Sequence, residues 1–169
     1  MDEIMIPTLM REMIGFFQPD VKRINHALKV QSFAHLISKE TDVDDRKTLI
    51  VSLAALLHDI GIKAAEQKYH SSSGNYQEIE GPPIAYKLLS SYNLDQDITE
   101  RVCFIIGNHH SYSKIDDIDF QILVEADFLV NFFEESMRGK VIEKIRDSIF
   151  KTKAGIRLLE GMYLDEYEL

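Results

Sequence analysis

Residues 53–61 read Leu-Ala-Ala-Leu-Leu-His-Asp-Ile-Gly. The run from 48 to 57 is apolar on nearly every side, which predicts a helix buried inside a helical bundle. Gly61 is the residue type that usually follows the end of a helix. Because burying an unpaired carboxylate is costly, such a group is normally neutralised, paired or bound to metal. His58 and Asp59 therefore predict a metal site on which other residues should converge.

The composition limits the classes of protein to which this chain can belong. Of the 169 residues, 45% are hydrophobic and 28% charged, as in one soluble globular domain. The formal net charge of -9 argues against stable binding to nucleic acid or to an anionic membrane, because both need a positive surface. A bound divalent ion would reverse the charge at one site only.

The sequence predicts a cytoplasmic protein. Cys103 is the only cysteine, which excludes an intrachain disulfide and favours a reducing compartment. Residues 1–10 lack the basic segment of a signal peptide. The uninterrupted apolar runs are shorter than the roughly 20 residues that a helix needs to cross a bilayer.

The spacing of apolar residues predicts an all-α fold, since no stretch alternates with a period of two. Asp20 is the expected N-cap of a helix over 21–40. Gly81, Pro82 and Pro83 are expected to open a helix over 84–92, and Asp97 with Glu100 to form a capping box for the next. Further helices are expected over 4–17, 119–136, 140–152 and 154–163, with polar surface loops over 69–76 and 111–117.

His26 is expected to face inward. It shares a stripe with Val30, Phe33 and Ile37, at intervals of four, three and four residues. His35 lies nine residues further along, about 180° around the helix, so it should lie at the surface.

Two later segments supply similar residues. His109 continues an apolar face that begins at Ile98, whereas His110 is displaced by about 100°. Asp127 lies between Leu123 and Val130 on another apolar stripe. One inward histidine is usually a hydrogen-bonded core residue, and Asp127 alone could pair with a Lys or Arg. Convergence of all these groups favours a divalent transition metal ion, namely Mn, Fe, Zn, Ni or Co.

This pattern resembles the HD-domain superfamily of metal-dependent phosphohydrolases. The matching segments are Arg23-Ile24-Asn25-His26, Leu56-Leu57-His58-Asp59-Ile60-Gly61, Ile105-Ile106-Gly107-Asn108-His109-His110 and Glu125-Ala126-Asp127. The length predicts a single domain over 1–169. Within it, the resemblance covers an HD core at 21–131, which leaves flanking helices at 1–20 and 132–169. It also implies a multi-helix bundle with the metal site between the central helices.

The resemblance further implies a set of metal ligands. Asp59 would also orient or deprotonate the attacking water. The primary ligands would be His26, His58, Asp59 and Asp127.

The number of ions is left open at one or two per chain. Relatives with two metals usually carry a further histidine where this chain has Gln77, so Glu78 or Glu80 would replace it or the second ion would be absent. His109 and His110 would remain available for a second ion or for substrate.

Three residues are candidates for contact with substrate. Lys63 and Lys68 could contact a phosphate, although a solvated surface lysine is the more common role for each. Glu80 is a third candidate.

The function implied by the resemblance is hydrolysis of a phosphate mono- or diester by metal-activated water. The substrate would be a nucleotide or another small phosphorylated metabolite, covered by the loop over 69–76. One alternative is a non-catalytic nucleotide- or metal-sensing domain, which a broken ligand set would favour. A second is a diiron oxygenase, which iron content and oxygen uptake would favour. A homodimer through aromatic residues near the termini is a further possibility.

Overall fold

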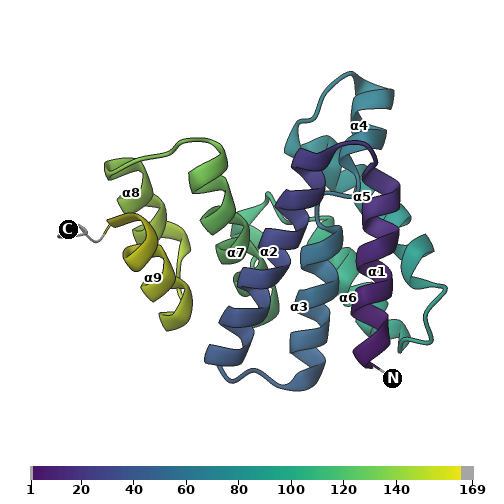
Figure 1. Cartoon of the computed structure of the whole chain (residues 1–169), viewed down its shortest axis with the longest axis horizontal. Helices are drawn as coiled ribbons and strands as arrows, with labels where there is room; N and C mark the ends of the chain where they lie inside the picture. The colour runs from purple at the N-terminus through teal and green to yellow at the C-terminus, as the bar shows by residue number, and fades with distance from the viewer. Residues whose placement is uncertain (1, 165–169) are drawn as a thin grey trace.

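The structure is a computed structural model that describes residues 2–164 (Figure 1). Every regular element within this range is helical, which confirms the predicted all-α fold. The predicted bounds of 1–169 include residue 1 and residues 165–169, which lie outside the described part of the chain. The helices are α1 (Asp2–Phe17), α2 (Val21–Glu40), α3 (Asp45–Leu57), α4 (Ile62–Tyr69), α5 (Gly74–Leu89), α6 (Gln96–Ile106), α7 (Ile118–Glu134), α8 (Lys140–Ile149) and α9 (Lys153–Leu159).

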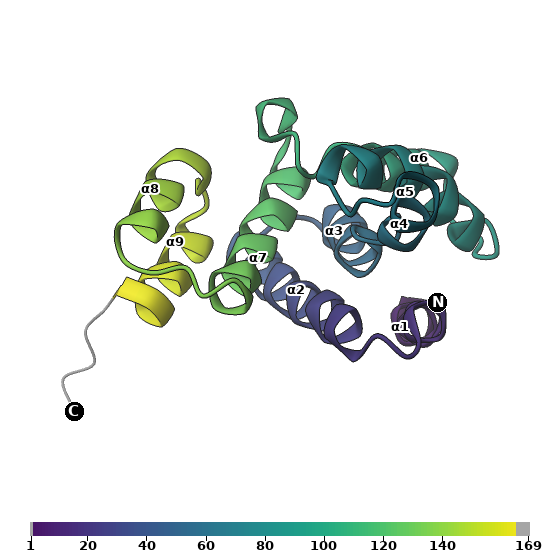
Figure 2. The same ribbon diagram turned by 90° about the horizontal axis from the view of Figure 1, so that it is seen from above.

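Helix α3 lies at the centre of the bundle, as its composition predicts. It packs against α1, α2, α6 and α7, and its residues from 50 to 57 are all buried. Helices α4, α5 and α6 lie on one side of α3, whereas α8 and α9 lie beyond α7 on the other (Figures 1 and 2). The apolar composition of α3 therefore results from neighbours on all sides.

One stretch, Asp45–Tyr69, is long and apolar enough to cross a membrane by length and composition alone. It comprises α3, a turn and α4, and most of its apolar window is buried inside the fold. No uninterrupted apolar run spans this stretch, because His58 and Asp59 interrupt it. Its apolarity is that of a core helix in a soluble fold.

Helix α5 begins earlier than expected. The prediction of a helix opening at Gly81 is wrong, because α5 runs from Gly74 to Leu89 with Pro82 and Pro83 inside it. Each proline removes a backbone hydrogen bond, but packing of α5 against α4 and α6 maintains the helix. The predicted loop over 69–76 consequently shrinks to residues 70–73, and Gln77 lies on a helix.

Two other local predictions differ from the structure. The capping box of Asp97 and Glu100 is wrong, because α6 begins one residue after Asp95, and Asp97 instead pairs with Arg46. The other predicted helix ends agree within about three residues, apart from α9, where a π-helical turn (Glu160–Leu164) continues the chain. His35 is exposed, as predicted.

Gly61 is required for a different reason from the one expected. Its φ is -75°, which any residue can adopt, so it does not end α3 in the left-handed region. A Cβ atom at Gly61 would instead lie 2.6 Å from the carbonyl oxygen of Gln77 and 2.6 Å from the backbone nitrogen of Gly81. The turn after α3 therefore packs directly against the backbone of α5.

A buried carboxylate holds the C-terminal helices to the core. Glu125 on α7 is fully buried, and its Oε1 accepts hydrogen bonds from the backbone nitrogens of Lys151 and Thr152 at 2.6 and 2.9 Å. The same oxygen accepts from Gln121 Nε2, and Oε2 accepts from the hydroxyl of Thr152. These bonds satisfy the backbone between α8 and α9.

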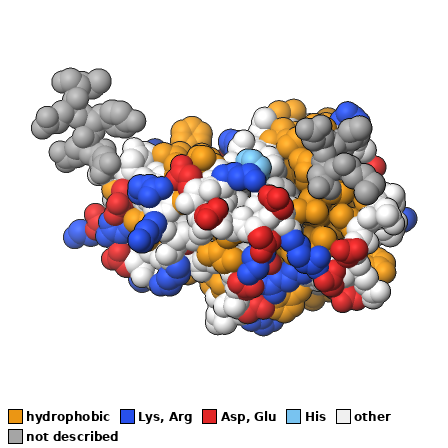
Figure 3. Space-filling model, turned by 90° about the horizontal axis from the view of Figure 1, so that it is seen from below, with side chains coloured by type: hydrophobic (Ala, Val, Ile, Leu, Met, Phe, Trp, Pro, Cys, Tyr) orange, Lys and Arg blue, Asp and Glu red, His pale blue; other side chains and the backbone are white. Residues whose placement is uncertain are grey.

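Acidic and basic side chains intermingle on the surface. On the face drawn in Figure 3, acidic and basic side chains lie beside one another. In the described chain, ion pairs such as Arg46 with Asp95 and Lys47 with Asp117 join distant segments.

Substitution of Gly61 by Ala is expected to lower the free energy of unfolding by about 1–3 kcal/mol, because the new methyl group would collide with backbone atoms that cannot rotate away. Urea unfolding followed by circular dichroism measures the change. Gly15→Ala in α1 is the matched control, since a Cβ there meets nothing within 4 Å. The control should be stabilised by roughly 0.5–1 kcal/mol. Equal effects at both positions would contradict the packing argument.

Substitution of Glu125 by Ala is expected to cost more than substitution by Gln. Alanine leaves several buried donors without an acceptor, at about 1–3 kcal/mol for each unsatisfied group. Glutamine keeps one oxygen for the two backbone nitrogens. Thermal unfolding of both variants measures the difference, and a smaller loss for Ala than for Gln would show that the carboxylate is not needed as an acceptor.

Candidate metal site

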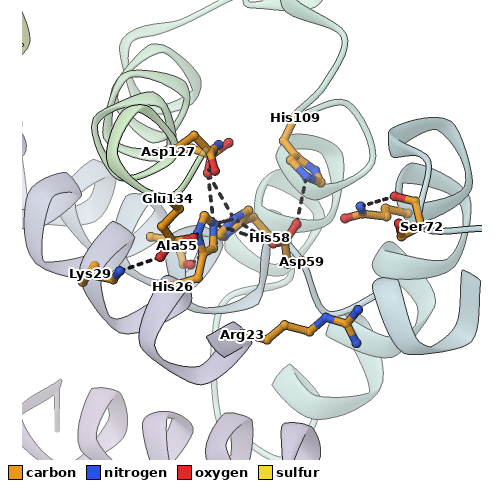
Figure 4. A network of polar contacts seen from close by, with 12 residues as sticks. Arg23, His26, Lys29, Ala55, His58, Asp59, Ser72, His109, Asp127 and Glu134 are labelled. Carbon is orange, nitrogen blue, oxygen red and sulfur yellow. Dashed lines mark hydrogen bonds and ion pairs between the residues drawn. The ribbon is translucent and has the colours of Figure 1, made fainter. Parts of the chain in front are cut away.

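The predicted ligands converge from four parts of the fold (Figure 4). α2 contributes His26, and the turn after α3 contributes His58 and Asp59. His109 lies in the turn after α6, and Asp127 lies on α7. The convergence expected from helical periodicity is therefore present in the structure.

The nitrogen and oxygen atoms of the first cluster lie close together. His26 Nε2 lies 3.2 Å from His58 Nε2 and 3.1 Å from Asp127 Oδ1. Asp59 Oδ2 lies 3.7 Å from His26 Nε2 and 3.5 Å from His58 Nε2. Neutral imidazole nitrogens and carboxylate oxygens repel one another unless a proton or a cation lies between them, so this donor set fits a divalent transition metal ion.

Hydrogen bonds at the other ring nitrogens orient the imidazoles. His58 Nδ1 donates to the carbonyl oxygen of Ala55 at 2.9 Å. His26 Nδ1 donates to Glu134 Oε2 at 2.9 Å, and Lys29 pairs with the second oxygen of Glu134. With the proton on Nδ1, each Nε2 presents a lone pair to the centre of the cluster, as in protein metal sites.

A second cluster shares Asp59 with the first. Asp59, His109 and His110 each offer an atom within 4.8 Å of the others. His109 Nδ1 donates to the carbonyl oxygen of Ile106 at 2.7 Å, which directs Nε2 to a position 3.6 Å from Asp59 Oδ1. The Nε2 atoms of both histidines are buried and have no hydrogen-bond partner among the described residues. These groups are compatible with a second ion or with substrate.

The carboxylates control the charge of the first cluster. Burial alone lowers the pKa of His26, but its hydrogen bond with Asp127 and the charges of Asp127 and Asp59 raise it to about 9. Burial raises the pKa of Asp59, yet the neighbouring imidazoles of His58 and His109 hold it well below its usual range. A metal ion must therefore displace a proton from His26 at neutral pH.

The remaining histidines divide into two groups. Burial lowers the pKa of His58, and burial together with the charge of His109 lowers the pKa of His110 to about 4. Burial also acts to lower the pKa of His109, but the adjacent Asp59 raises it overall. His58 and His110 are therefore neutral at physiological pH and available as ligands.

The first cluster opens onto a pocket of about 380 Å³. Its lining combines candidate ligands with two cations, and includes His26, Asp59, His110, Asp127, Lys22 and Arg23. A second groove of about 430 Å³ lies between α1, α2 and α3, and none of the candidate ligands lines it.

The three residues predicted to contact substrate, Lys63, Lys68 and Glu80, do not line the pocket beside the first cluster. Lys63 Nζ donates to the carbonyl oxygen of Phe16 at 2.7 Å, on the side of α1. Lys68 pairs with Glu80 Oε2 at 2.5 Å, and Glu80 Oε1 accepts from the hydroxyl of Tyr69. The three residues therefore have structural partners in this conformation, and their contact with substrate remains a prediction.

Sequence analysis missed several residues around the cluster. Asn131 Nδ2 donates to Asp127 Oδ1 at 3.0 Å, and Glu134 orients His26. Both follow Asp127 on one helical face, at i+4 and i+7, a spacing that could have identified them. Arg23 was included only in a matching segment, although it lines the pocket and pairs with Glu66. Glu78 accepts from the backbone nitrogen of His110, so it supports the second cluster instead of joining it.

Comparison with known proteins adds a family match. A model of the HD domain matches residues 23–147. The chain is also similar in structure to a predicted HD superfamily hydrolase from an uncultured Thermotogales bacterium, with a TM-score of 0.65 and 22% sequence identity. That likeness covers 92% of this chain and 82% of the other, and at this identity it supports the fold alone. No curated protein matches the chain.

Substitution of Asp127 by Asn is expected to move the titration of His26 to lower pH, because it removes the charge that contributes most to raising the pKa. NMR of the imidazole resonances in chelator-treated protein measures the change. Asp147→Asn, on the exposed face of α8, is the control and should leave the titration of His26 in place. An unchanged pKa in Asp127→Asn would contradict the assigned pairing.

Proposed function

The chain belongs to the HD-domain family, and on that premise we propose that it is a metal-dependent phosphohydrolase. The observation that carries the proposal is the convergence of two imidazoles and two carboxylates at the edge of a pocket. Both imidazoles have their Nδ1 atoms bonded elsewhere, so their Nε2 atoms are available as ligands.

The proposed ligands are His26, His58, Asp59 and Asp127, with His109 and His110 available for a second ion. A divalent ion held there would lower the pKa of a water molecule and offset negative charge on a phosphoryl group. Its identity is proposed to be Mn, Fe, Zn, Ni or Co, because imidazole and carboxylate ligands occur together.

Asp59 has the central position among these side chains. Its Oδ2 faces His26 and His58, whereas its Oδ1 faces His109. A carboxylate shared in this way can hold the attacking water in a fixed orientation. Because its pKa lies well below the usual range, Asp59 remains ionised at neutral pH.

Two cations line the same pocket and can attract the phosphate. Arg23 is held in place by Glu66 and Asp20, and Lys22 is exposed at the pocket. Positioning and charge account for most of the catalysis in phosphoryl transfer, so a fixed cation such as Arg23 suits the reaction. A pocket of about 380 Å³ matches a nucleotide or another small phosphorylated metabolite.

The alternatives have less support. A sensing domain is favoured by a broken ligand set, whereas all four proposed primary ligands are present in this chain. A diiron oxygenase requires a full second ligand set, and Gln77 takes the position where two-metal relatives have a histidine. A cytoplasmic location and a homodimer remain predictions.

Elemental analysis of purified protein after incubation with manganese is expected to give one or two ions per chain in the wild type and few in Asp59→Ala. Phosphate release from a panel of nucleotides and sugar phosphates should fall at least a hundredfold in that variant, because Asp59 contacts both histidine clusters. Asp45→Ala is the matched control, since this carboxylate is fully exposed on α3. Absence of metal from the wild type would contradict the hydrolase proposal.

A further inference from the structure

The NH₂ group of the Gln77 side chain is held in place by a hydrogen bond. Gln77 lies on α5, is 6% exposed, and its Nε2 donates to the carbonyl oxygen of Ser72 at 2.8 Å. A carbonyl oxygen can only accept, so the NH₂ group of the amide must face Ser72. The amide oxygen, Oε1, therefore points away from Ser72.

The other half of the amide has no partner. Gln77 Oε1 is buried and makes no hydrogen bond to any described residue. Gln77 lines the same pocket as Asp59 and His110, and Ser72 lies on the side of the site nearest to His109 in Figure 4. Because a buried acceptor without a donor costs free energy, a donor that enters the pocket would be favoured at this oxygen.

The chemistry of the donor follows from the pocket. A phosphate group presents acceptor oxygens, so it cannot satisfy Gln77 Oε1 and belongs with the cations Lys22 and Arg23. A neutral amide oxygen gives no charge compensation to an ammonium group. A neutral hydroxyl group is therefore the donor that fits Gln77 best.

We propose that Gln77 selects for a hydroxyl group on the part of the substrate that does not carry the phosphate. The pocket would then prefer the phosphate ester of a sugar or another polyol over an alkyl phosphate. This inference rests on the proposed function, because it concerns the substrate of the same site. Gln77 would then bind substrate at the position where two-metal relatives usually have a metal-binding histidine.

The experiment compares ribose 5-phosphate with pentyl phosphate. Both have five carbons, and ribose 5-phosphate carries hydroxyl groups and a sugar-ring oxygen that pentyl phosphate lacks. The ratio of their kcat/KM values is measured for manganese-loaded wild type and for Gln77→Met, which is nearly isosteric but lacks the acceptor. The ratio is expected to fall at least tenfold, because a site built to bond a hydroxyl loses its discrimination with the acceptor. Gln96→Met, at an exposed position of α6, is the matched control.

Binding provides a readout that does not depend on turnover. Calorimetry on chelator-treated protein gives the dissociation constants of both esters, and Gln77→Met should lose the preference for ribose 5-phosphate. If the wild type releases phosphate from no member of the panel of nucleotides and sugar phosphates, the proposed function fails, whereas the binding preference still decides the role of Gln77. Equal binding of both esters by the wild type would overturn the proposed role of Gln77.

Two further results would overturn the inference. An unchanged ratio in Gln77→Met would show that no substrate hydroxyl uses the amide oxygen. Loss of metal from Gln77→Met would assign the oxygen to the ion or its water. If Gln77→Met does not fold, Gln77→Leu is a second variant of similar size that lacks the acceptor. It should also lose the preference, and an unchanged preference there would also reject the proposal.

Discussion

The close approach of His26 Nε2 and His58 Nε2, at 3.2 Å with two carboxylates beside them, is the constraint on which the structure depends. Two neutral imidazole nitrogens repel at this distance, so a proton or a cation must lie between them. The surrounding fold holds the two rings at this distance. Helix α3 is buried by α1, α2, α6 and α7, and the Nδ1 atoms are bonded to Ala55 and Glu134.

A second constraint joins this cluster to the wall of the pocket. The turn that carries His58 and Asp59 ends at Gly61, which packs against the backbone of α5 at Gln77 and Gly81. A side chain at position 61 would separate α5 from the turn. The contact of Gly61 with α5 therefore fixes the distance between the metal ligands and the side-chain amide of Gln77. It contributes both to the stability of the turn and to the shape of the pocket.

Much of the site could be predicted from the sequence because helical periodicity assigns a face to each residue. That reasoning placed His26, His58, His109 and Asp127 inward, and the structure brings them together. It failed for α5, where Pro82 and Pro83 indicated a helix start and tertiary packing outweighed their local preference. It also could not pair Lys68 with Glu80, since a solvated lysine and a paired one have the same sequence pattern.

The sequence by itself determined the all-α class and the set of candidate ligands, because composition and spacing are local properties of the chain. Only the tertiary structure decided which atoms of those ligands face each other, since ring orientation depends on distant partners such as Glu134. The same is true of the unpartnered oxygen of Gln77, whose direction is set by the carbonyl of Ser72. Hydrogen bonds between neighbouring elements orient side chains, and periodicity alone assigns them only to a face.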